Sequence, residues 1–196
     1  MATEEKSNKQ VAILGGGCFW CTEAVFLRVR GVTSVTSGYT GGTVPNPTYE
    51  QICRGDTGHA EVIRIEFSPD VISFEQVLDI FFHTHDPTTL NRQGADSGTQ
   101  YRSAVFFNSS QQKAVAADII KTLDDSGVFR DPIVTTLEEL KKFYPAEDYH
   151  QNYYNLNPNQ GYCRVVIDPK MAKFRKRYSK LLKPAETEPN KPQAPQ

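Results

Sequence analysis

The chemistry that this sequence can carry centres on its four cysteines, Cys18, Cys21, Cys53 and Cys163. Cys18 and Cys21 form a C-x-x-C pair, a spacing that suits half of a zinc site or a redox-active dithiol. Four cysteines in 196 residues are too few for a scaffold of structural disulfides. We therefore expect these cysteines to act as reactive thiols or as metal ligands.

Cys18 follows three glycines, Gly15–Gly17, which stop a short apolar run. The run predicts a buried strand, and the spacing of Trp20, Ala24 and Leu27 predicts a helix that begins directly after Cys18. A thiol at a helix N-terminus lies near unsatisfied N–H groups and the positive end of the helix dipole, which favour the thiolate over the thiol. Cys18 is therefore predicted to be a nucleophile.

Two other interpretations of the C-x-x-C pair stay open. A thioredoxin-like disulfide oxidoreductase also places such a pair between a strand and a helix. A zinc-binding interaction module would need two further ligands, for which the candidates are Cys53, His59, His83, His85, His150 and Cys163. No second C-x-x-C pair accompanies the first, so zinc is disfavoured, and we interpret His83 and His85 as ordinary loop and helix-capping residues.

Aromatic and acidic residues could complete a site around Cys18. Two adjacent aromatic residues at a helix start cannot both face one core, so we expect Phe19 or Trp20, or both, to line an apolar pocket. Glu61 opens a strand of apolar residues, where burial would raise its pKa and let it donate a proton. An exposed glutamate is nevertheless the more frequent outcome on an alternating strand. Tyr101 closes a long polar loop and could present its hydroxyl there.

The elements that must position these residues interleave irregularly. Strands are expected at 11–14, 32–39, 59–67, 103–107 and 132–136, and helices at 19–30, 48–54, 74–82, 111–123, 148–154 and 170–182. This order predicts an α+β fold, with helices packed on a small mixed sheet. We expect one domain over residues 10–182, flanked by polar tails at 1–9 and 183–196.

Composition narrows the class of protein further. The chain has 22 Lys and Arg against 23 Asp and Glu, so it lacks the basic excess that nucleic-acid binding needs. No apolar run reaches the roughly 18 residues of a membrane span, and the first ten residues lack the apolar centre of a secretory signal. We therefore expect a cytoplasmic monomer that binds neither nucleic acid nor membrane.

Six short motifs lie in order between Gly15 and Cys163. They are Gly17-Cys18-Phe19-Trp20 with Glu23, Gly38-Tyr39-Thr40-Gly41-Gly42, Thr57-Gly58-His59-Ala60-Glu61, His85-Asp86-Pro87, Gly98-Thr99-Gln100-Tyr101-Arg102-Ser103 and Gly161-Tyr162-Cys163. In this order they resemble the peptide methionine sulfoxide reductase A family. The resemblance implies an α/β sandwich with a ferredoxin-like core and a long irregular C-terminal segment. It also implies reduction of the S epimer of methionine sulfoxide, free or in oxidised proteins.

The resemblance further implies a role for each site residue. Cys18 attacks the sulfoxide sulfur, and Glu61 donates a proton to the sulfoxide oxygen. Tyr39 and Tyr101 hydrogen-bond that oxygen, and Asp96 supports the site through water. No metal or organic cofactor is implied.

By the same resemblance, Phe19 and Trp20 enclose the methyl group of the substrate. Loss of methionine leaves Cys18 as a sulfenic acid, which a second thiol condenses to a disulfide, and thioredoxin then reduces that disulfide. Many members have glycine at the position of Cys21 and a further cysteine after the Gly-Tyr-Cys motif, whereas none follows Cys163 here. The resolving thiol therefore stays open between Cys163, in a turn-rich segment that could swing toward Cys18, and Cys21.

Overall fold

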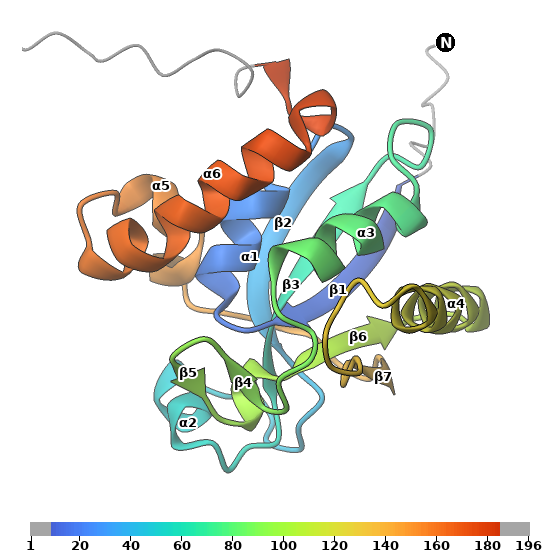
Figure 1. Ribbon diagram of the computed structural model, residues 1–196. Helices are drawn as coiled ribbons and strands as arrows, with labels where there is room; N and C mark the ends of the chain where they lie inside the picture. The colour runs from blue at the N-terminus through green and yellow to red at the C-terminus, as the bar shows by residue number, and fades with distance from the viewer. Residues whose placement is uncertain (1–8, 185–196) are drawn as a thin grey trace, which may run out of the picture.

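A computed structural model describes residues 9–184, and its centre is a six-stranded sheet in the order β7-β6-β1-β3-β2-β8 (Figure 1). The strands are β1 (Gln10–Gly16), β2 (Val32–Thr40), β3 (Ala60–Phe67), β6 (Ser103–Phe107), β7 (Thr136–Glu139) and β8 (Tyr144–Pro145). All neighbouring strands run antiparallel except β6 and β7, which are parallel. The sheet is therefore mixed, as the sequence predicted.

The four central strands follow the ferredoxin-like arrangement. Along the chain, helix α1 (Phe19–Phe26) connects β1 to β2, and helix α3 (Phe74–Thr84) lies between β3 and β6. In the sheet, the four strands stand in the order β6-β1-β3-β2. This is the β-α-β-β-α-β unit, in which each helix connects two strands that are not neighbours. The predicted α+β fold with a ferredoxin-like core is confirmed.

Alternation along β3 divides the core into two layers. Ile63 and Ile65 belong to the large cluster with α1 and α3, whereas Val62 belongs to a smaller cluster on the other face of the sheet. Helix α6 (Asp168–Arg177) lies over α1 on the helical face (Figure 1). Because side chains two residues apart share a face, Glu61 has the same parity as Ile63 and points to the helical layer.

Local capping explains where the remaining helices begin and end. Helix α2 (Tyr49–Arg54) starts at a capping box between Thr48 and Gln51 and ends at Gly55, which has a left-handed φ of 76°. Helix α4 (Ser110–Ser126) begins at Ser109, whose hydroxyl accepts a hydrogen bond from a backbone N–H of the first turn. None of the described helices is long and apolar enough to span a bilayer.

Several predicted boundaries are wrong. The strand expected at 132–136 lies at Thr136–Glu139, because pairing with β6 rather than β-branched content defines it. Helix α1 is shorter than 19–30, and the long polar loop contains a small hairpin of β4 (Arg92–Gln93) and β5 (Asp96–Ser97).

The C-terminal part of the chain also differs from prediction. The helix expected at 148–154 is split into a 3-10 turn (Asp148–His150) and α5 (Tyr153–Leu156), because Asn152 has a left-handed φ of 53° that no helix can continue. The terminal helix begins at Asp168, directly after a π-helical turn (Cys163–Ile167). A 3-10 turn at Ser179–Leu181 follows it.

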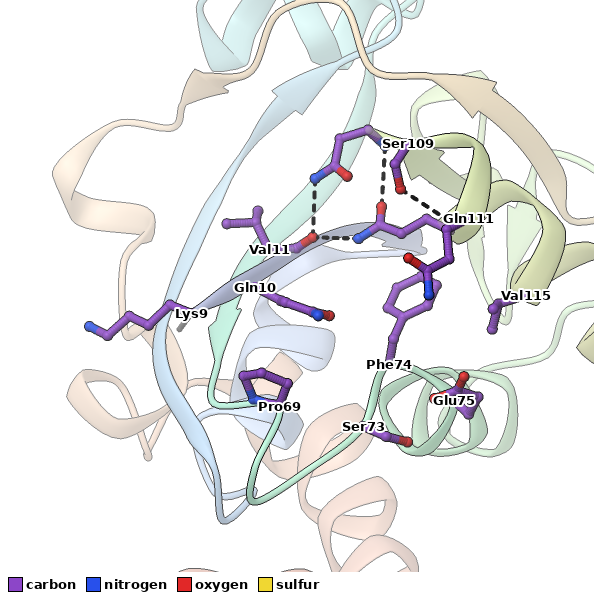
Figure 2. Close-up of a pocket in the computed structure, with 12 residues that line it drawn as sticks. Lys9, Gln10, Val11, Pro69, Ser73, Phe74, Glu75, Ser109, Gln111 and Val115 are labelled. Carbon is purple, nitrogen blue, oxygen red and sulfur yellow. Dashed lines mark hydrogen bonds between the residues drawn. The ribbon is translucent and has the colours of Figure 1, made fainter. Parts of the chain in front are cut away.

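A surface hollow of about 430 Å³ lies at the start of β1, at the opposite end of that strand from Cys18 (Figure 2). The carbonyl of Val11 accepts hydrogen bonds from Asn108 and from Gln112 at its wall. Residues of the starts of α3 and α4 complete the lining, and no cysteine is among them. This hollow therefore offers no thiol for the predicted chemistry.

Candidate active site

The strand-to-helix turn that carries Cys18 is built by glycine. Gly17 has a φ of 88°, and a Cβ there would lie 2.5 Å from Cγ of Gln93. Only glycine fits both that conformation and that approach. The turn makes Cys18 the N-cap residue of α1 with 8% of its surface exposed. The predicted place of Cys18 at a helix start is confirmed.

The carboxyl group of Glu61 is buried beside this helix start. Glu61 is 2% exposed, and its Oε2 accepts a hydrogen bond of 3.1 Å from the backbone N–H of Phe19. Burial raises the pKa of Glu61 to about 8, although the Phe19 hydrogen bond opposes the rise and the charges of Asp96 and Cys21 add to it. The expectation of an exposed glutamate is therefore wrong, and at pH 7 the carboxyl is mostly protonated.

The surroundings of Cys18 do not favour the predicted thiolate. Burial, a hydrogen bond to Cys21 and the charge of Glu61 raise the pKa of the Cys18 thiol well above its ordinary value. The first free N–H of α1 donates to Glu61, and the Cys18 side chain makes no capping hydrogen bond within residues 9–184. The helix terminus thus directs its first free N–H to an oxygen of the Glu61 carboxyl rather than to the sulfur.

The lowered pKa that was expected for Cys18 is found at Cys21 instead. Its pKa is lowered to about 7, first because the Cys18 thiol donates a hydrogen bond to it and then because Lys170 is positively charged. Its Sγ lies 3.7 Å from the hydroxyl of Tyr162, and that hydroxyl donates to Oδ2 of Asp96 at 2.7 Å. Cys18 and Cys21 therefore form a coupled pair of thiols, both of them free and buried.

Aromatic side chains stand beside this pair. Trp20 is half-buried, stacks on Tyr153 at 3.7 Å between ring centroids and donates its indole N–H to Nδ1 of His150 at 3.0 Å. Phe19 is 1% exposed and packs against Tyr39 at 5.7 Å. Trp20 is therefore the more accessible wall, and Phe19 belongs to the core behind it.

The two predicted tyrosines lie on different elements. Tyr39 on β2 is the direct cross-strand partner of Glu61, and its hydroxyl donates to Oε2 of Glu147 at 2.9 Å. Tyr101 ends a 3-10 turn (Thr99–Tyr101) and is half-buried. Burial and then the negative charges of Glu61 and Asp96 raise its pKa, so Tyr101 faces the same cluster.

Cys163 lies in the interior at the start of the π-helical turn. Its side chain is 0% exposed, and burial raises its pKa, with smaller contributions from the charges of Asp168 and Cys21. The Cys163 side chain is therefore packed in the interior, whereas residues 155–161, the turn-rich segment before it, are mostly exposed. Cys53, by contrast, is exposed on α2.

Four residues near the site were not assigned from sequence. Glu23 accepts hydrogen bonds from the backbone N–H groups of Asn152 and Tyr153, which ties α5 to α1. Tyr162 joins Asp96 to Cys21, and its place beside Cys163 in the Gly-Tyr-Cys motif was a usable signal. Glu147 and Tyr153 are known as site neighbours only from contacts across more than 100 residues of chain, which no local pattern encodes.

The histidines are used within the fold. His85 is the C-cap residue of α3, and its two ring nitrogens contact the carbonyl of Phe81 and the hydroxyl of Ser103. His83 lies within the last turn of α3 and contacts the carbonyl of Asp79, so the capping interpretation is confirmed for His85 and is wrong for His83. Among residues 9–184, no group of three or more His, Cys, Asp or Glu side chains could hold a metal ion.

Comparisons with known proteins agree with this arrangement. A family model described as peptide methionine sulfoxide reductase matches residues 10–182. The peptide methionine sulfoxide reductase MsrA of Deinococcus radiodurans is 55% identical over 181 residues, which are 92% of this chain and 88% of that protein.

Two solved structures are similar over most of the fold. Mxr1 of Saccharomyces cerevisiae in reduced form is 35% identical with a TM-score of 0.73, covering 81% of this chain and 91% of that one. Methionine sulfoxide reductase A of Corynebacterium diphtheriae is 32% identical with a TM-score of 0.70, covering 80% and 78%. The chain therefore belongs to the peptide methionine sulfoxide reductase family.

Proposed function

We propose that this protein reduces the S epimer of methionine sulfoxide, free or in oxidised proteins, with Cys18 as nucleophile and Glu61 as general acid. The observation that carries the proposal is the carboxyl of Glu61, which is buried, has a pKa raised by that burial and accepts a hydrogen bond from the residue that follows Cys18. A sulfoxide oxygen leaves poorly until it is protonated, and a neutral carboxylic acid supplies that proton at neutral pH.

In the proposed first step, the Cys18 sulfur attacks the sulfoxide sulfur and forms an S–S bond, while Glu61 protonates the oxygen and takes up the Cys18 thiol proton. A second protonation by Glu61 breaks the S–O bond and releases water. Water then attacks the Cys18 sulfur and breaks the S–S bond, which releases methionine reduced by two electrons, leaves Cys18 as a sulfenic acid and returns a proton to Glu61. Tyr101 would donate a hydrogen bond to the oxygen, and Tyr39 would do so when its hydroxyl proton turns from Glu147 to the substrate. Asp96 would support the site through water. Trp20 and Phe19 would enclose the methyl group.

The sulfenic acid then condenses with a second thiol, which forms a disulfide and releases water. Cys21 and Cys163 are the candidates: Cys21 because the Cys18 thiol donates a hydrogen bond to its sulfur, and Cys163 because it belongs to the same buried cluster. On a regular helix, residues three apart have diverging Cβ directions, so a Cys18–Cys21 bond requires the first turn of α1 to distort.

An external dithiol must reduce the disulfide, and we propose thioredoxin for this step. We propose a cytoplasmic location as well, because recycling by thioredoxin needs a compartment in which thiols stay reduced. The catalytic unit in this proposal is a single domain over residues 10–182.

The experiment that tests the proposal supplies dithiothreitol and each sulfoxide epimer separately and measures the methionine formed. Turnover of the S epimer and none of the R epimer is the expected result. A protein that reduces neither epimer but reduces insulin disulfides would instead be a thioredoxin-like oxidoreductase. Stoichiometric zinc in the purified protein, with no turnover, would support an interaction module.

A further inference from the structure

His150 lies at the back of the aromatic wall and is fully buried. Its ring is surrounded by Phe19 at 5.1 Å, Tyr49 at 4.3 Å and Tyr149 at 4.1 Å between centroids. Such surroundings alone would suit a phenylalanine as well as a histidine. The polar contacts of the imidazole therefore decide whether it has a further role.

The Nδ1 atom of His150 accepts the indole N–H of Trp20 at 3.0 Å. An indole nitrogen only donates, so Nδ1 must be unprotonated and the ring proton must lie on Nε2. Burial lowers the pKa of His150, which keeps the ring neutral and the acceptor available. This contact joins positions 130 residues apart in the chain.

The Nε2 atom of His150 is buried and has no hydrogen-bond partner within residues 9–184. It lies 3.8 Å from Oε2 of Glu147, the oxygen that accepts the hydroxyl of Tyr39. The other carboxylate oxygen of Glu147 accepts the backbone N–H of Tyr49 at 2.7 Å. Glu147 is thus fixed on both oxygens, and its charge attracts the Nε2–H of His150 and holds the tautomer that Trp20 needs.

We propose that His150, oriented by Glu147, is a positioning residue that fixes the Trp20 indole as the wall of the substrate methyl pocket. The inference rests on the proposed function, in which Trp20 contacts substrate. Glu147 also accepts the hydroxyl of Tyr39. The Glu147 carboxylate and the His150 imidazole therefore position two sides of the pocket, Tyr39 and Trp20. A histidine suits this position because its neutral ring accepts at Nδ1 while its Nε2–H lies 3.8 Å from the charge of Glu147.

Two variants test whether His150 positions the Trp20 indole or only fills space behind it. His150→Phe keeps an aromatic ring but removes the acceptor, whereas His150→Asn places an amide oxygen close to the position of Nδ1. A neutral hydrogen bond typically contributes enough to change an equilibrium about two- to tenfold. We expect His150→Phe to raise KM for the sulfoxide by about that factor with a smaller change in kcat, and His150→Asn to restore most of the loss.

Trp20 is the only tryptophan of the chain, so its fluorescence reports on the contact without any turnover. His150→Phe should change the emission maximum and increase quenching by acrylamide, and His150→Asn should resemble the wild type. Tyr149→Phe is the matched control, since this exposed neighbour of His150 has no polar contact with Trp20 in the described residues. Equal effects of the Phe and Asn variants, or none from either, would overturn the inference.

A measurement on the unmodified chain covers the case in which a variant fails to fold. The single indole N–H resonance should exchange slowly with solvent, and the ¹⁵N shifts of His150 should show a proton on Nε2. Rapid exchange, or a proton on Nδ1, would refute the proposed contact. Failure of the wild type to reduce sulfoxide would refute the proposed function instead, and would leave these spectra unaffected.

Discussion

Glu61→Gln tests how the buried acid works, because the change keeps the shape of the side chain and removes its transferable proton. A carboxyl with a pKa of about 8 is about 90% protonated at pH 7, whereas the ordinary value of 4.5 would leave about 0.3%. Burial at this position therefore increases the population of acid about 300-fold.

General acids typically contribute a factor of about 10² to 10⁴ in rate. We expect Glu61→Gln to slow the first turnover at pH 7 by that factor. The wild-type rate should fall as the pH rises past about 8, because Glu61 ionises there, and the variant should lack this fall.

The assay is a single turnover with protein in excess over the S epimer and no reductant, quenched in acid, with methionine measured against time. Glu66→Gln is the matched control on the same strand, where the carboxylate pairs with Arg64 near the surface. Its rate should equal that of the wild type. A Glu61→Gln protein with a near wild-type rate, or with the same loss above pH 8, would refute the reasoning.

Four further predictions follow from the same geometry. Because folding raises the pKa of Glu61, its contribution to stability is complete below pH 4.5 and is lost as the pH rises through about 8. In urea unfolding, the free energy of unfolding of Glu61→Gln should therefore exceed that of the wild type by up to about 5 kcal/mol at pH 9 and by little at pH 4. Equal differences at the two pH values would contradict this prediction. Folded Cys18→Ser should form no methionine in a single turnover, since an oxygen cannot replace the attacking sulfur, so any measurable turnover counts against the nucleophile. Trp20→Ala should raise KM more than it lowers kcat in steady-state kinetics, because it removes a wall and no proton; unchanged saturation would count against the methyl pocket. Cys163→Ser should keep turnover with dithiothreitol and lose much of it with thioredoxin, and Cys21→Ser should lose less; normal thioredoxin turnover of Cys163→Ser would assign resolution to Cys21.

The sequence was sufficient to predict the fold class and the place of the nucleophile. A short apolar run identified β1, apolar alternation identified β3, and the glycines before Cys18 marked the turn into α1, because these features depend on neighbours in the chain. The position of β7 could not be predicted in the same way. Its polar residues are held by pairing with β6 and by the hydrogen bonds that Arg102 donates to Glu138. Both are contacts between distant parts of the chain, which a local pattern does not show.

The ionisation states at the site were beyond sequence reasoning. A helix N-terminus predicts a thiolate at Cys18, but the fold directs the first N–H to Glu61 and buries the sulfur beside Cys21. The π-helical turn that buries Cys163 was equally hidden, since residues 155–161 before it are rich in turn-forming residues and predict a segment that could swing. For Cys18, the competing contact comes from Glu61 on a distant strand.

The most direct test of the central claim is a thiol count after one equivalent of the S epimer is added to the reduced protein without reductant. Alkylation and peptide mass spectrometry then identify which cysteines have become protected. We predict one methionine per molecule, the loss of two thiols, and Cys18 in the resulting disulfide with either Cys21 or Cys163. Methionine formed while Cys18 remains alkylatable, or two thiols lost with no methionine, would contradict the account.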